Sequence, residues 1–367
     1  MTAANTYTIV LDVMGADRGP ATIIQGGIEA AQAVGDRLRV VLVGDEDVIQ
    51  SALDELEEVP DNVDVKHAEQ TVPMEMGATE GARMRKSSVA VGIGLVKKGT
   101  ADAFVSPGNT GAVMATSLLT LGRIAGVSRP AITSTFPTST GKPCIVLDVG
   151  ANADCKPQHL SQFAVMGSVY AQVSRRVASP RVGLISIGEE RSKGNELIFS
   201  ARELLKDSQI NFVGNIEGRD ILSGVVDVAV TDGFTGNILL KFAESIQPML
   251  VSAIKRQIQT NIFSRFGVMM MLPFMRRMRN TFDYAQWGGA PLLGVNGIVV
   301  ICHGSSSARA ITNAVTGAYR MAHQGITERL RDELITNHFG TENGSSKTKG
   351  EDIGDGVVYT TAPDDQR

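Results

Sequence analysis

Glycine and small polar residues that can bind an anion follow a short apolar segment at positions 106–111, with the sequence S-P-G-N-T-G. Glycine lets the backbone turn tightly and come close to a ligand. A helical pattern follows, and the free N–H groups at the start of a helix attract anions. The candidate ligands for phosphate or a carbonyl oxygen are Ser106, Gly108, Asn109 and Thr110. The alternative is an ordinary helix start capped by Asn109.

Comparable polar turns follow five further apolar segments. Their sequences are D-V-G-A-N at 148–152, G-E-E-R-S-K-G-N-E at 188–196, N-I-E-G at 215–218, T-D-G-F-T-G-N at 231–237 and H-G-S-S-S at 303–307. In a parallel sheet, ligands bind outside the carboxyl ends of the strands, so these turns are expected to share one active-site cleft. The candidate binding residues in them are Asp148, Asn152, Glu189, Glu217, Ser305 and Ser306, and the candidate catalytic residues are Lys193, Asp232, Asn237 and His303.

A seventh polar turn, D-V-M-G-A-D at 12–17, carries two carboxylates. Two carboxylates at one strand end can hold magnesium. The interpretation that we favour is structural: Asp17 caps the next helix, and Asp12 accepts hydrogen bonds from loop N–H groups. We therefore predict no metal site.

These residue types favour transfer of an acyl group to phosphate. Inorganic phosphate is itself a charged oxygen nucleophile, so the protein has only to position it against an activated carbonyl and to stabilise the oxyanion. Lys193 can neutralise the phosphate, and Asp232 and Asn237 can orient groups around a thioester. His303 can protonate a leaving thiolate or donate to the oxyanion, or it can be a structural histidine. No G-x-S-x-G turn or Ser-His-Asp order is present.

Short Val- and Ile-rich segments alternate with helical patterns and must position these turns. Such alternation is typical of a largely parallel sheet covered by helices on both faces. The predicted strands are 7–14, 38–43, 63–67, 102–105, 131–136, 143–149, 182–187, 225–230 and 297–302, with a further strand ending at 213. The predicted helices are 21–34, 110–123, 158–177, 196–205, a long helix from 236, and 305–322.

Composition excludes several classes of protein. The 367 residues are 43% hydrophobic and 20% charged, as in globular domains, and a net charge of -4 argues against a dedicated nucleic-acid binder. The three cysteines have no C-x-x-C spacing, which argues against a disulfide framework or a structural zinc site. We find neither a signal peptide nor an apolar run of about 18 residues. We therefore expect a cytoplasmic enzyme.

Taken in order, the seven motifs resemble those of the bacterial phosphate acyltransferases of phospholipid synthesis, the PlsX family. The resemblance covers about residues 9–322, and only the lead 1–6 and a polar tail depart from it. It implies transfer of a long-chain fatty acyl group from acyl carrier protein to inorganic phosphate, giving acyl phosphate for phosphatidic acid synthesis. It also implies a three-layer α/β/α, Rossmann-like fold similar to phosphotransacetylases and isocitrate dehydrogenases, a homodimer, and no cofactor. A membrane glycerol-3-phosphate acyltransferase is a further candidate partner.

The predicted organisation is a phosphate acyltransferase domain over 7–335, a projecting helical hairpin over about 236–284, and a disordered tail over 340–367. In the hairpin, large apolar residues lie among arginines, which suits contact with an anionic lipid surface. The predicted membrane-contact residues are Phe266, Met270, Met271, Leu272 and Phe274. A dimer contact or a packed hairpin is the alternative. In the family, similar helices project from the dimer and touch the membrane.

The acidic acyl carrier protein requires a basic docking face, or else these charges are ordinary solvated side chains. The candidates are Arg83, Arg85, Lys86, Lys97 and Lys98. Two other functions compete with the acyltransferase. A dehydrogenase of the same fold would need a nicotinamide site and a metal-binding carboxylate cluster, neither of which is convincing here. A non-catalytic scaffold would have no use for the polar strand ends.

Overall fold

A computed structural model describes residues 6–259 and 288–337. Eleven strands of the described part form one sheet. In chain order they are β1 (Tyr7–Asp12), β2 (Leu38–Gly44), β3 (Val63–His67), β4 (Ala103–Ser106), β5 (Ala131–Phe136), β6 (Cys144–Leu147), β7 (Val182–Ile185), β8 (Phe212–Ile216), β9 (Val228–Val230), β10 (Ala290–Leu293) and β11 (Ile298–Ile301). Their spatial order is β3-β2-β1-β4-β11-β10-β5-β6-β9-β7-β8.

The sheet has two parallel parts that run in opposite directions. Strands β3, β2, β1, β4 and β11 are mutually parallel, and we call them the first half-sheet. Strands β6, β9, β7 and β8 are also mutually parallel and form the second half-sheet. Three antiparallel pairings, β11 with β10, β10 with β5 and β5 with β6, reverse the direction between them. The sheet is therefore largely parallel, as predicted, with three antiparallel pairings at its centre.

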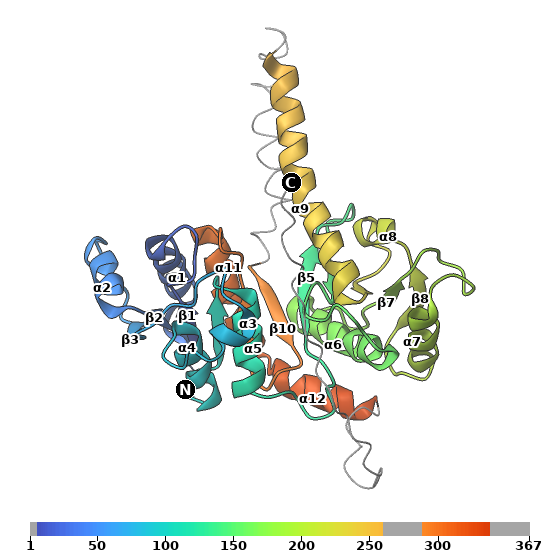
Figure 1. Ribbon diagram of the computed structural model, residues 1–367, viewed down its shortest axis with the longest axis horizontal. Helices are drawn as coiled ribbons and strands as arrows, with labels where there is room; N and C mark the ends of the chain where they lie inside the picture. The colour runs from blue at the N-terminus through green and yellow to red at the C-terminus, as the bar shows by residue number, and fades with distance from the viewer. Residues whose placement is uncertain (1–5, 260–287, 338–367) are drawn as a thin grey trace, which may run out of the picture.

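Helices cover both faces of the sheet (Figure 1). Their bounds are α1 (Pro20–Val34), α2 (Glu46–Asp54), α3 (Ala78–Gly81), α4 (Ser88–Lys97), α5 (Thr110–Thr120), α6 (Pro157–Arg175), α7 (Glu196–Lys206), α8 (Gly218–Ser223), α9 (Gly233–Gln259), α11 (Ala308–His323) and α12 (Ile326–Thr336), with a 3-10 turn at Gly35–Arg37. The fold is the predicted three-layer α/β/α arrangement.

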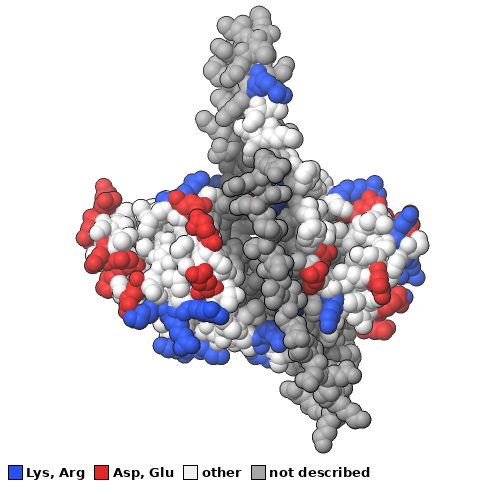
Figure 2. Space-filling view, viewed as in Figure 1, with Lys and Arg blue, Asp and Glu red and all other residues white. Residues whose placement is uncertain are grey.

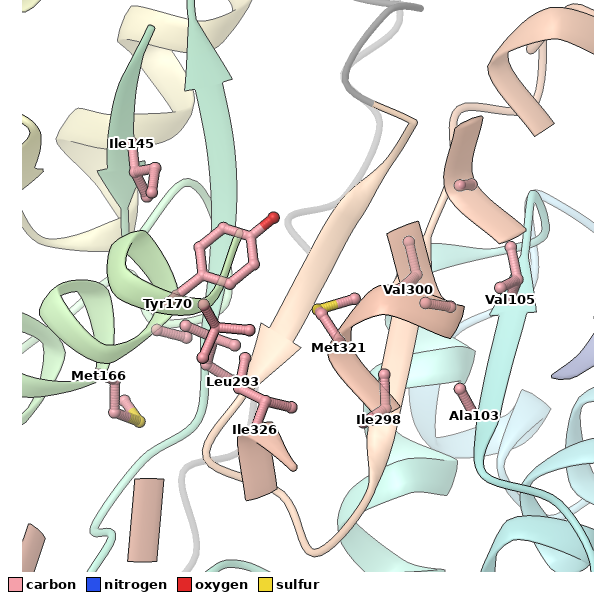
Figure 3. Packing of buried hydrophobic residues seen from close by; sticks show 14 of the residues in the cluster. Ala103, Val105, Ile145, Met166, Tyr170, Leu293, Ile298, Val300, Met321 and Ile326 are labelled. Carbon is pink, nitrogen blue, oxygen red and sulfur yellow. The ribbon is translucent and has the colours of Figure 1, made fainter. Parts of the chain in front are cut away.

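Alternate residues of each buried strand supply the two apolar layers. In β1, Ile9 and Leu11 belong to one core cluster and Val10 to the other. Strand side chains point alternately to opposite faces, so a strand buried on both faces must be apolar throughout. Figure 3 shows the first of these layers, in which side chains of α6 and α11 pack on the sheet. This is why the Val- and Ile-rich segments could be recognised as strands from the sequence.

The helix α9 stands out from the body of the molecule (Figure 1). It has 27 residues, a length of about 40 Å, and it is the described part of the hairpin predicted over 236–284. The five predicted membrane-contact residues and the tail 340–367 lie outside the described residues. None of the described helices is both long and apolar enough to span a bilayer.

Candidate functional site

The predicted site residues form two clusters. The first cluster consists of the turns at 12–17, 106–111 and 303–307, which follow β1, β4 and β11 of the first half-sheet. The second cluster consists of the turns at 148–152, 188–196, 215–218 and 231–237, which follow the four strands of the second half-sheet. Neighbouring parallel strands bring the turns of each cluster together.

Asp12 and Ser106 form the buried base of the first cluster. The hydroxyl of Ser106 donates to Asp12 Oδ2 at 2.8 Å and accepts from the N–H of Gly108 at 3.0 Å. Burial raises the pKa of Asp12, and the hydrogen bonds from Ser106 and Ser88 oppose this shift. A Cβ atom on Gly15 would lie 2.5 Å from the Cα of Gly108, so the two turns touch through their backbones.

Asp12 and Asp17 hold loops rather than flank a common ligand. Asp12 accepts from the N–H of Met14, as predicted. Asp17 does not cap α1, because Gly19 occupies the cap position; instead its N–H donates to the carbonyl of Gly304 at 2.9 Å. No group of three or more His, Cys, Asp and Glu side chains in the described ranges is arranged to hold a metal ion.

The start of α5 offers unpaired donors beside this base. Asn109 caps the helix by accepting from the N–H of Ala112, and its amide donates to three carbonyls of the 73–76 loop. Its side chain is thus fully used within the protein. Thr110 is exposed, and its N–H, its hydroxyl and the N–H of Gly111 form no hydrogen bond with a described residue. These donors, rather than the Asn109 amide, are free for an anion.

His303 is exposed at the end of β11, next to the same turn. Its Nδ1 accepts a hydrogen bond from the N–H of Ser305 at 3.1 Å and lies 2.8 Å from the Ser305 hydroxyl. A backbone N–H can only donate, so Nδ1 must be unprotonated and the proton of the neutral ring lies on Nε2. Ser306 is buried, with its N–H donating to the His303 carbonyl. The arrangement presents an N–H donor toward solvent.

Asp148 organises the second cluster. Its buried carboxylate accepts from the N–H groups of Ile132, Gly150, Ala151 and Asn152 and from the Asn152 side chain. Burial raises the pKa of Asp148, and these hydrogen bonds oppose the shift. The remaining amide hydrogen of Asn152 goes to the carbonyl of Pro130. The side chains of Asp148 and Asn152 therefore hold the 148–152 loop in place.

The turn at 231–237 packs against the Asp148 loop and starts α9. The carboxylate of Asp232 accepts from the N–H and the hydroxyl of Thr235 at 2.8 and 2.9 Å, which caps the helix. A Cβ on Gly236 would lie 1.9 Å from the carbonyl oxygen of Asp148, so only glycine fits there. Asn237 is exposed, and its side chain forms no hydrogen bond with a described residue. Asn237 is thus free to meet a substrate, whereas Asp232 is occupied.

Glu189 and Glu217 share a partner that the sequence did not single out. Arg219 bridges them, with Nη2 3.1 Å from Glu189 Oε1 and Nε 3.1 Å from Glu217 Oε2. Its position two residues after Glu217, in N-I-E-G-R, was the only available signal. Lys193 is exposed and forms no ion pair within the described residues. It is an unpaired cation of the second cluster, as is Arg191 of the same turn.

The two clusters do not touch through polar contacts. The carbonyl of Ser106 accepts from the N–H of Cys302, at the end of β11. The carboxylate of Asp148 accepts from the N–H of Ile132, near the start of β5. Because β5 runs parallel to β11, these two contacts lie toward opposite ends of the strands. No hydrogen bond or ion pair between described residues joins the clusters. Because the second half-sheet is reversed, a single pocket lined by both clusters stays a prediction.

The seven motifs belong to a family that sequence comparison identifies. A family model described as "Fatty acid synthesis protein" matches residues 7–329. The chain is 48% identical over 330 residues to the phosphate acyltransferase of Desulforamulus reducens. The alignment covers 89% of this chain and 97% of the relative. The chain belongs to this family of phosphate acyltransferases. It is also 46% identical over 326 residues to the phosphate acyltransferase of Myxococcus xanthus, with 88% and 92% covered.

Solved structures confirm the fold of this phosphate acyltransferase family member. A phosphotransacetylase from Streptococcus pyogenes superposes with a TM-score of 0.61 at 17% identity, covering 87% of this chain and 94% of that one. A branched-chain phosphotransacylase from Enterococcus faecalis gives 0.56 at 14% identity, covering 87% and 99%. The chain therefore has the predicted α/β/α architecture, and its membership of the phosphate acyltransferase family makes it an acyltransferase. Its free donors and unpaired cations suit charge stabilisation better than a nucleophile-and-base pair.

Proposed function

We propose that the chain transfers a long-chain fatty acyl group from the thioester of acyl carrier protein to inorganic phosphate. The products are acyl phosphate, for phosphatidic acid and phospholipid synthesis, and free carrier protein. The observation that carries the proposal is the 48% identity to a phosphate acyltransferase over 89% of the chain. The unpaired donors at the start of α5 support it, because both phosphate and a thioester oxyanion need such donors.

In the proposed reaction, a phosphate oxygen attacks the thioester carbon and forms a new C–O bond. The tetrahedral oxyanion then collapses, the C–S bond breaks, and the leaving sulfur takes up a proton. The N–H groups of Thr110 and Gly111 are suited to hold the phosphate or the oxyanion. His303 is suited to hold the oxyanion or the leaving sulfur by a hydrogen bond, because its Nδ1 is occupied as an acceptor and its Nε2–H remains free to donate. The attacking hydrogen phosphate releases the proton that the sulfur takes up.

Lys193 tests whether the second cluster takes part. We expect purified protein, incubated with acyl carrier protein thioester and phosphate, to form acyl phosphate without added nucleotide. Replacing the unpaired cation in Lys193→Ala should raise the phosphate KM or lower turnover at least about tenfold, a loss of roughly 1.4 kcal/mol in transition-state binding. The measurement is the initial rate over a phosphate titration.

Lys206→Ala is the matched control. Lys206 is a lysine of the same half of the molecule, and it pairs at the surface with Glu203. A surface pair of this kind contributes little, so its loss should leave the kinetics unchanged. Wild-type kinetics for a folded Lys193→Ala variant would separate the second cluster from the phosphate, while failure of the wild-type protein to form acyl phosphate would reject the function.

The proposal includes docking of acyl carrier protein on a basic surface. The five candidate residues are exposed: Arg83, Arg85 and Lys86 precede α4, and Lys97 and Lys98 end it. Figure 2 shows Lys and Arg side chains gathered along the lower edge of the half that carries α3 and α4. Lys86 is paired with Glu69, which leaves the other four charges more available to an acidic partner.

The proposal also includes a homodimer and peripheral contact with the membrane from the cytoplasm. Among the described side chains of α9, five large apolar ones are exposed: Phe234 (63%), Ile238 (53%), Phe242 (66%), Met249 (61%) and Val251 (39%). At 100° per residue the first four fall on one side of the helix and Val251 on the other. An exposed apolar stripe of this kind is typical of a contact surface, and a second copy of the chain or a lipid surface would bury it. A membrane glycerol-3-phosphate acyltransferase would then receive the product nearby.

Membrane contact has a direct test. The variant Met270→Glu/Phe274→Glu places two charges in the predicted contact segment. Burial of a charge in the membrane interface is unfavourable, so we expect its cosedimentation with anionic liposomes to fall at least about fivefold. Val225→Glu is the control, because Val225 is a half-exposed apolar residue of the body. Equal sedimentation of all three proteins would contradict contact through this segment.

A further inference from the structure

A cavity of about 160 Å³ lies between the two half-sheets, on the face covered by α6 and α11. Tyr170 and Arg175 of α6 line one side, and Arg320 and Met321 of α11 line the other. Figure 3 shows Tyr170 and Met321 on either side of β10, which forms part of the floor. None of the residues of the first or second cluster lines this cavity, so it is separate from the candidate active site.

The cavity is lined by a half-buried arginine, and one of its N–H groups is buried without an acceptor. The Nη1 atom of Arg175 is buried and has no hydrogen-bond partner. Asp227, an acid whose charge acts on Arg175, is already paired with Arg181 at 3.0 Å. An unsatisfied guanidinium N–H inside a protein costs free energy and is uncommon in folded proteins. An anionic or carbonyl acceptor in the cavity could therefore form a hydrogen bond with Nη1 of Arg175.

The other polar side chains around Arg175 can donate as well, although the hydroxyls among them can also accept. Arg320 is exposed at the rim and forms no ion pair with a described residue. Burial raises the pKa of Tyr170 to about 12, so its hydroxyl stays protonated and can donate at neutral pH. Thr135 adds a second hydroxyl. The described residues of the lining include no Asp or Glu, so the wall carries two positive charges and no negative one.

Apolar side chains complete the wall and limit the size of a ligand. Val173, Pro291, Val300 and Met321 contribute hydrocarbon surface beside the two arginines. A cavity of about 150 Å³ holds a molecule the size of benzene, or about six non-hydrogen atoms. The combination of a cationic end and an apolar wall selects a ligand that is itself charged at one end only.

We propose that this cavity binds a small amphipathic anion, with a carboxylate or phosphate group between Arg175 and Arg320 and a short apolar body against Val300 and Met321. A carboxylate and a phosphate group share the chemistry that the arginines recognise. The bound anion contacts both α6 and α11, so it links the two halves of the fold.

The test uses the full chain and three probes of equal size: butyrate, methyl phosphate and the neutral butyramide. We expect butyrate or methyl phosphate to bind saturably with a Kd on the order of 1 mM, followed by ligand-observed NMR, and butyramide not to bind. The probe that binds identifies the head group. Arg175→Gln and Arg320→Gln should each weaken binding at least about tenfold, because each removes one guanidinium.

One control separates this site from the rest of the molecule. Arg329→Gln removes an exposed arginine of α12 outside the cavity. It should bind the anion as wild type does. The proposal is overturned if neither anion binds up to about 50 mM, if butyramide binds equally well, or if both cavity variants keep wild-type affinity. If a segment of a second chain fills the cavity, neither anion will bind.

Discussion

Gly236→Ala should destabilise the protein strongly, whereas the same substitution at Gly94 should stabilise it. A Cβ at position 236 would lie 1.9 Å from the carbonyl oxygen of Asp148, and this atom is backbone that cannot rotate away. The start of α9 and the 148–152 loop would have to separate. We expect a loss of roughly 3 kcal/mol, the upper end of the range for overpacked positions.

Gly94 provides the matched control for this prediction. It lies inside α4, and a Cβ there would meet nothing within 4 Å. Alanine in a helix interior is more favourable than glycine by about 0.5–1 kcal/mol, because it restricts the unfolded chain. Thermal unfolding followed by circular dichroism should therefore shift in opposite directions for the two variants. A Gly236→Ala protein with the midpoint of wild type would show that the turn at 231–237 is not locked onto the Asp148 loop.

The prediction has a functional side as well. Asn237 is the exposed polar residue of the same turn, and its position follows from the contact at Gly236. Displacing the start of α9 moves Asn237 together with the Asp232 cap. Acyl transfer by the surviving folded fraction of Gly236→Ala should therefore fall more than its stability alone explains. Gly94→Ala should keep full activity, because α4 holds no residue of either cluster.

The buried strands could be predicted because their chemistry is simple. A strand covered on both faces must be apolar throughout, so segments such as Ile9–Leu11 and 298–301 stand out in the sequence. Strand direction is a different matter. It depends on which strands become neighbours: β5 still runs parallel to β11, and the net reversal comes from the antiparallel pair of β5 and β6. Strand β10, which has four residues and begins Ala290-Pro291, is not among the predicted strands. Proline and the flanking glycines conceal such a strand.

Helix α4 shows how burial overrides local preference. Its sequence, S-V-A-V-G-I-G-L-V-K, is rich in valine and glycine, which favour strands or turns over helix. The helix forms because Ser87 caps it and because glycine allows close packing: a Cβ on Gly92 would lie 2.3 Å from the ring of Phe104. Neither the packing partner nor its distance can be inferred from the ten residues themselves.

The polar turns were found from the sequence, but the role of each residue was not. Asn109, Asn152 and Asp232 are all occupied by hydrogen bonds within the protein. The same residue types serve as turn and cap residues and as ligands for substrate. Sequence cannot separate these uses, because the separation depends on which donors remain unpaired after folding. That criterion selects Thr110, Asn237 and Lys193, and it places Arg219 among the acidic residues of the second cluster.

Asp148→Ala tests whether a predicted site residue acts by positioning rather than by chemistry. The carboxylate accepts five hydrogen bonds from N–H groups, and its removal would leave those donors buried without acceptors. Each unsatisfied donor costs about 1–3 kcal/mol, and water entering the space recovers part of the loss, so we expect about 3–5 kcal/mol in all. On heating, the circular dichroism signal of the folded variant and its acyl phosphate formation should be lost over the same temperature range.

Two further variants separate the possible roles of Asp148. Asp154→Ala removes an exposed carboxylate of the next turn and should change the unfolding free energy by less than about 0.5 kcal/mol. Asp148→Asn keeps the shape but turns an NH₂ group toward the N–H donors, so it should lose most of the same stability. A catalytic base would behave differently, because its amide variant would stay folded and lose only activity. Wild-type stability together with abolished turnover in Asp148→Asn would therefore place Asp148 at the reacting atoms and refute its role as the organiser of the second cluster.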